Sequence, residues 1–155
     1  MNDDTMQLRA VEISSLPAEE REKVYADLFP KPVVETKPVT DEDLKTALRT
    51  VAQGSPGYVY TAPEWMGDGT AQCFYVHNAR DAENVLAPGC MIAYALNALG
   101  VPLVALKRWE HRPASEVVAA FFPNASGEII DAYRRAQSRQ DRGQPWGKAI
   151  RGLDL

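Results

Sequence analysis

The chain has 155 residues and a formal net charge of −4 at neutral pH, a length that allows one domain with a normal hydrophobic core. Its content of 45% apolar and 25% charged residues is typical of a globular protein and excludes a largely disordered chain. No run approaches the ~20 apolar residues of a membrane span, and the acidic N-terminus does not resemble a signal peptide. We therefore expect a cytoplasmic protein that does not associate with a membrane.

The first part of the chain is expected to be an N-terminal extension, residues 1–39, ahead of a single globular domain, residues 40–155. A serine cap, early acidic residues and an apolar edge predict a short amphipathic helix over about residues 17–28. The three prolines within residues 30–38 favour an extended, semi-rigid spacer. The helix either packs on the same domain or reaches a second protomer or a partner, so residues 16–29 are the candidate segment for homo-oligomer formation.

The next helix is expected to follow Thr40. Thr40 and Asp43 have the spacing of a capping box, in which each residue accepts a hydrogen bond from the backbone of the other. Gly54 and the turn residues after it should end this helix. Its apolar stripe consists of Leu44, Ala47, Leu48 and Val51.

Two short aromatic and β-branched runs then predict antiparallel strands over residues 57–61 and 72–77, joined by a long loop. The loop carries Trp65 and Met66 among turn residues. Large apolar side chains at a loop tip form a candidate contact surface for a partner. The alternative is that they fold back as a lid on the core, since Trp is highly buried on average.

The most apolar stretch predicts a buried central helix over residues 88–99, around which the other elements should pack. Gly100 stands where a left-handed residue would end this helix. Pro102 should keep the apolar run over residues 101–106 from being helical. The inward stripe of the central helix consists of Ile92, Ala95, Leu96 and Leu99.

Two further helices are expected after the central one, the first beginning at Pro113 and the second capped by Asn124 or Ser126, before a last turn over residues 146–150. The sequence thus predicts an α+β, mostly helical fold, with about five helices around residues 88–99 and a small antiparallel β element. The second of these helices carries a set of arginines that should face water: Arg134, Arg135, Arg139 and Arg142. This set is either a solvated helix face or a surface that binds phosphate or an acidic partner through bidentate contacts.

Cys90 is the one residue that suggests catalysis. In the first turn of a helix, free N–H groups and the helix dipole lower the pKa of a thiol. His111 or His77 would then serve as the base of a small cysteine-dependent hydrolase or acyltransferase. The alternative, which we favour, is that Cys73 and Cys90 are free thiols packed in the protein interior.

A metal site would need Cys73, His77, Cys90 and His111 together, which is the complete cysteine and histidine content of the chain. Zinc sites normally show two closely spaced ligand pairs, and this spacing does not provide them. No phosphate-binding glycine motif occurs either. We expect neither a metal nor another cofactor.

Several short motifs resemble those of small uncharacterised proteins of actinobacteria and actinobacteriophages. They are a Gly-Cys helix start at Gly89, the Ala-Leu-x-x-Leu-Gly-Val run that ends at Val101, and Gln-Asp-x-Gly-x-Pro-Trp from Gln140 to Trp146. The resemblance covers about residues 40–150. It implies a phage or actinobacterial setting, in the host cytoplasm if the protein is phage-encoded, and implies no mechanism.

These observations lead to a non-enzymatic interaction protein that binds another protein, of the host or the phage. Its candidate binding residues are Trp65, Met66, Arg134, Arg135 and Arg139. The alternative is the thiol enzyme using Cys90 with His111. A DNA-associated regulator is a third hypothesis. Residues 107–155 hold 9 basic and 6 acidic side chains, and this excess of positive charge is far smaller than that of a DNA-binding face.

Overall fold

The computed structural model describes residues 38–62, 74–78 and 85–155. The chain divides into two units, residues 1–37 and residues 38–155, and the described residues all belong to the second. The expected N-terminal helix, its role in oligomer formation and most of the proline-rich spacer fall outside the described residues.

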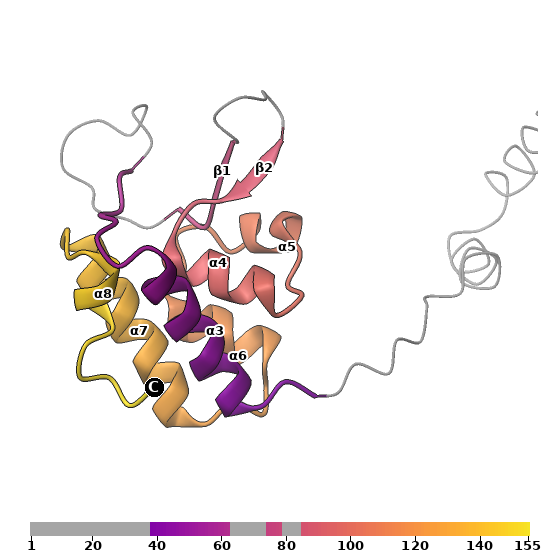
Figure 1. Ribbon diagram of the computed structural model, residues 1–155. Helices are drawn as coiled ribbons and strands as arrows, with labels where there is room; N and C mark the ends of the chain where they lie inside the picture. Colours follow the sequence, from indigo (N-terminus) through magenta and orange to yellow (C-terminus); the bar gives the residue numbers. More distant parts are fainter. Residues whose placement is uncertain (1–37, 63–73, 79–84) are drawn as a thin grey trace, which may run out of the picture. The chain divides into compact units, whose positions relative to one another are not determined.

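The fold is α+β and mostly helical, as the sequence predicts, with six helices and one two-stranded antiparallel sheet among the described residues (Figure 1). α4 lies centrally and packs against α3, α7 and α5. No helix in this part of the chain is long and apolar enough to cross a membrane. The elements are α3 (Asp41–Gly54), β1 (Val76–Asn78), β2 (Leu86–Pro88), α4 (Met91–Ala98), α5 (Leu103–Lys107), α6 (Ala114–Phe121), α7 (Gly127–Asp141) and α8 (Trp146–Ala149).

The capping box predicted for α3 is confirmed. Thr40 Oγ1 accepts a hydrogen bond from the Asp43 backbone N–H at 3.2 Å, and Asp43 Oδ2 accepts one from the Thr40 N–H at 2.8 Å. These bonds satisfy N–H groups that have no partner within the helix. The apolar stripe lies inward, with Leu44 and Leu48 fully buried, and the helix ends at Gly54 as expected.

The β element differs from the prediction. β1 (Val76–Asn78) overlaps the second expected strand, but its partner is β2 (Leu86–Pro88), with Val76 opposite Pro88. Residues 58–60 are not a strand, because the Tyr58 carbonyl accepts its hydrogen bond from the Trp146 N–H at 2.9 Å. Alternation of apolar residues predicted extended chain there, but not which segment would pair with it.

A carboxylate holds the start of the hairpin. Glu110 Oε2 and Oε1 accept hydrogen bonds from the Tyr75 and Val76 N–H groups, each at 2.9 Å. Burial raises the pKa of Glu110, and these two bonds act against that rise. The contact joins the hairpin to the segment after α5, far away in sequence.

The central helix is shorter than predicted, and α5 was not predicted at all. α4 begins at Met91, because Pro88 belongs to β2 and Cys90 occupies the N-cap. Gly100 has φ +93°, which confirms the left-handed residue after the helix. Pro102 does not prevent helix formation as expected, since it is the N-cap of α5, a place where its missing N–H costs nothing.

Two buried glutamines of α7 supply the caps that α4 and α6 lack. Neither Cys90 nor Pro113, the N-cap residues, makes a side-chain capping bond. Gln140 Oε1 accepts from the Met91 N–H at 2.9 Å. Gln137 Oε1 accepts from the Ala114 N–H at 2.6 Å. α7 therefore satisfies the first N–H groups of two neighbouring helices.

The same helix is joined to α3 and to the hairpin region. Tyr133 donates a hydrogen bond through its hydroxyl to the Leu44 carbonyl at 2.8 Å. Gln137 Nε2 donates to the Tyr75 hydroxyl at 2.9 Å, and that hydroxyl donates to the Arg112 carbonyl at 2.6 Å. Burial raises the pKa of both tyrosines above the usual range. These bonds fix the position of α7 within the core.

We expect Gln140→Met to lower the free energy of unfolding by about 1–3 kcal/mol, because the buried Met91 N–H loses its acceptor. Urea unfolding followed by circular dichroism measures the change. Gln53→Met is the matched control, since Gln53 is an exposed glutamine of α3 and should give a near-neutral change. Equal unfolding free energies for the two variants would contradict this role of Gln140.

Candidate functional site

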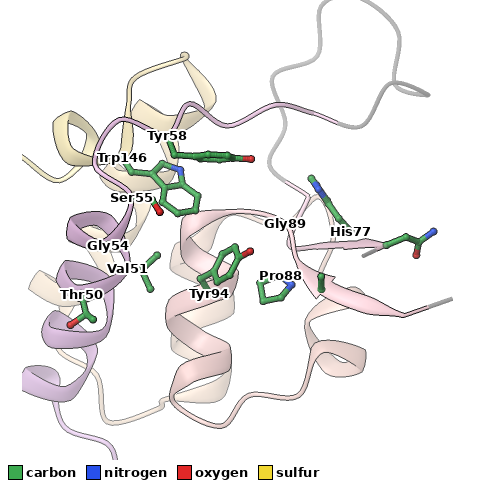
Figure 2. A pocket seen from close by; sticks show the side chains of 12 residues that line it. Thr50, Val51, Gly54, Ser55, Tyr58, His77, Pro88, Gly89, Tyr94 and Trp146 are labelled. Carbon is green, nitrogen blue, oxygen red and sulfur yellow. The ribbon is translucent and has the colours of Figure 1, made fainter. Parts of the chain in front are cut away.

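A groove of about 620 Å³ lies between the end of α3, the β hairpin, α4 and α8 (Figure 2). Its volume is within the range of ligand-binding sites in proteins. Four separate parts of the chain form its walls, so it exists only in the folded protein. It is lined by Thr50, Val51, Gly54, Ser55, Tyr58, His77, Asn78, Ala87, Pro88, Gly89, Tyr94 and Trp146.

Three aromatic residues form one side of the groove. Trp146 is only 5% exposed, whereas Tyr58 is 41% and Tyr94 44% exposed. The ring centroid of Trp146 lies 4.6 Å from that of Tyr58 and 5.9 Å from that of Tyr94. The buried indole thus supports two phenol rings that present much of their surface to solvent.

Backbone contacts fix Trp146 in this place. The Trp146 N–H donates to the Tyr58 carbonyl and the Gly147 N–H to the Pro56 carbonyl, both at 2.9 Å. A Cβ added at Gly147 would lie 3.0 Å from the Pro56 Cβ, closer than ordinary van der Waals contact. The Pro-Trp-Gly segment at the start of α8 therefore packs tightly against the turn after α3.

His77 and Gly89 form the opposite wall. A Cβ at Gly89 would lie 2.6 Å from His77 Nε2 and 2.6 Å from the Phe74 carbonyl oxygen, so only glycine leaves room for the imidazole. Burial lowers the pKa of His77, because a desolvated imidazolium is disfavoured. His77 is therefore neutral near pH 7.

Two buried nitrogens at this site have no hydrogen-bond partner among the described residues: His77 Nε2 and Trp146 Nε1. The described residues that line the groove include no aspartate, glutamate, lysine or arginine. With His77 neutral, these lining residues carry no formal charge. It is suited to an uncharged ligand that packs on aromatic rings.

Cys90 does not have the expected state. It is disulfide-bonded rather than a free thiol, and it is fully buried; the chain's other cysteine, Cys73, lies outside the described residues. A sulfur in a disulfide bond cannot act as a thiolate nucleophile. The prediction of two free thiols is therefore wrong for Cys90.

His111 is exposed and has φ +66°. Its ring packs edge-on against Phe74, with the centroids 5.1 Å apart. Of the four residues considered for a metal site, Cys73 is not described. Among the described residues no group of three or more histidine, cysteine, aspartate or glutamate side chains is arranged to hold a metal ion.

The predicted binding residues separate into two sets. Trp65 and Met66 lie outside the described residues. Arg134 and Arg135 both pair with Asp131, at 2.5 and 2.6 Å, and the hydrogen bond from Arg134 lowers the pKa of Asp131.

Arg139 is half-buried and is bound to the backbone, whereas the sequence predicts a water-facing side chain. Its Nη1 donates to the carbonyls of Ala149 and Arg151, at 3.1 and 2.7 Å. The guanidinium therefore holds the C-terminal turn against α7.

Sequence reasoning missed the groove, since it placed Tyr58 in a strand, Tyr94 in the buried central helix and Trp146 in a last turn. One feature of the sequence pointed to the groove. Tyr94 is the only residue of the central helix with a polar end on a long aromatic side chain, and it is the one large residue of α4 that is exposed.

The comparisons with known proteins give no family. No family model matches the chain, and no curated protein or solved structure shows significant similarity to it.

We expect the wild-type protein to lose more stability than His77→Gln between pH 7.5 and pH 5. The unfolded chain binds a proton at His77 with a pKa of about 6.5, while burial lowers the pKa in the folded state. Below about pH 6.5 the unfolded state therefore binds more protons, and the free energy of unfolding falls. Glu110 is present in both proteins, so its contribution cancels in the comparison. Urea unfolding of both proteins at the two pH values measures the difference in stability loss. Equal pH dependence of the two proteins would contradict the desolvation of the His77 imidazole.

We expect Gly89→Ala to lower the free energy of unfolding by about 1–3 kcal/mol, because the new methyl group collides with His77 and the Phe74 backbone. Gly127→Ala is the control. Gly127 lies in α7, and a Cβ there would meet nothing within 4 Å, so the change should be neutral or slightly stabilising. Thermal unfolding of both variants measures the difference, and a neutral Gly89→Ala would show that the hairpin wall is not closely packed.

Proposed function

We propose that the protein is a non-enzymatic interaction protein and that the groove of Tyr58, Tyr94 and Trp146 is its binding surface. The observation that carries the proposal is the exposure of two tyrosine rings, 41% and 44%, beside the buried Trp146. Tyrosine and tryptophan supply much of the binding energy at protein interfaces, because they bury large surfaces at small cost in side-chain entropy.

The alternative thiol enzyme has less support. Its nucleophile would be Cys90, which is buried and disulfide-bonded. The arginine surface also has less support than the groove, because Arg134, Arg135 and Arg139 are engaged within the chain. The resemblance in short motifs to actinobacterial and phage proteins supports a partner from an actinobacterial host or its phage.

A photo-crosslinking amino acid at position 78 tests the proposal. Asn78 is exposed and lines the groove. Position 104 is the matched control, since Val104 is 64% exposed and does not line the groove. In an actinobacterial extract we expect a discrete crosslinked protein from position 78 that is absent from position 104.

Replacing Tyr58 and Tyr94 by serine should reduce this crosslink at least ~10-fold, because loss of an aromatic anchor costs about 2 kcal/mol or more at an interface. Circular dichroism must show that the double variant remains folded. The same crosslinked species from both positions, or a crosslink that survives the double substitution, would contradict the proposal.

A further inference from the structure

The shape and surface of the groove indicate a ligand that packs on rings. Tyr58 and Tyr94 stand on either side of Trp146, with interplanar angles to the indole of 58° and 63°. Pro88 and Val51 add apolar surface from the hairpin and from α3 (Figure 2). Proline-rich segments in the polyproline II conformation dock in aromatic-lined grooves of several peptide-binding domains, where the pyrrolidine rings pack against the aromatic faces.

The charge of the groove restricts the ligand further. Of the twelve described residues that line the groove, none is acidic or basic apart from His77, and burial lowers the pKa of His77 so that it is neutral. A charged peptide would lose hydration on entering the groove without gaining a countercharge. An uncharged segment is the electrostatic complement of this surface.

The hydrogen-bonding groups of the rim also fit such a segment. The hydroxyls of Tyr58 and Tyr94 make no hydrogen bond within the described part of the chain, and Asn78 adds an exposed amide. These groups can donate to carbonyls, and polyproline II chain leaves all its carbonyls free because it has no internal hydrogen bonds. Proline offers no N–H that the groove would have to satisfy.

Addition of a peptide as a further β-strand fits this wall less well. A strand needs a regular row of free N–H and C=O groups. On this side Pro88 has no N–H, and the Gly89 N–H already donates to the Tyr75 carbonyl at 2.8 Å.

We propose that the groove of Tyr58, Tyr94 and Trp146 binds an uncharged, proline-rich segment of a partner protein in the polyproline II conformation. This proposal rests on the proposed function and names the chemical class of its partner. The segment is preorganised, so it loses little conformational entropy on binding. That property suits a groove whose described lining offers no charged anchor.

Titration of the ¹⁵N-labelled full chain with acetylated and amidated octaproline, followed by NMR, tests the proposal. We expect saturable shifts of the backbone amides of Gly54, Tyr94 and Gly147. A Gly-Ser peptide of equal length and charge should give no shifts at the same concentrations. Tyr58→Ala and Tyr94→Ala should each weaken binding at least ~10-fold, and Val104→Ala should leave it unchanged.

Both tyrosines are exposed enough for these variants to fold, and their spectra verify this directly. Absence of saturable shifts at millimolar octaproline, equal shifts with the Gly-Ser peptide, or no effect of either tyrosine variant would overturn the proposal. If octaproline fails while the crosslink from position 78 remains specific, the ligand class is wrong and the proposed function stands. If both fail, both are wrong.

Discussion

The packing of the domain depends on the two buried glutamine side chains of α7. A helix begins with N–H groups that have no partner within it, and burying them unsatisfied is costly. α4 and α6 both begin in the interior without a capping side chain, and Gln140 and Gln137 provide the acceptors. These two bonds join α7 to the starts of α4 and α6 and so tie the three helices together.

The position of the groove follows from this arrangement. α4, held by Gln140, places Tyr94 on the side toward α8. Arg139 of α7 binds the carbonyls of Ala149 and Arg151 and so keeps the C-terminal turn in place. Trp146 is thereby fixed between Tyr58 and Tyr94, and the aromatic surface depends on the same helix as the core.

Much of the local structure could be predicted because its causes are local. Thr40 and Asp43 form their capping box within four residues, and Ser126 caps α7 by accepting a hydrogen bond from the Ile129 N–H at 3.3 Å. Gly100 ends α4 because a left-handed conformation follows the helix there. The predicted strand pairing was wrong because its cause is not local. Periodicity identifies extended chain but carries little information about which segment it pairs with.

The sequence by itself determined the fold class, the approximate course of α3, α4, α6 and α7, and the burial of the central helix. These depend on periodicity and on capping between near neighbours. Only the tertiary structure decided the pairing of β1 with β2, the roles of Gln137 and Gln140, and the groove. Each of these needs residues that are distant in sequence to meet at a few ångströms, as Tyr58 and Trp146 do, and no local pattern encodes that distance.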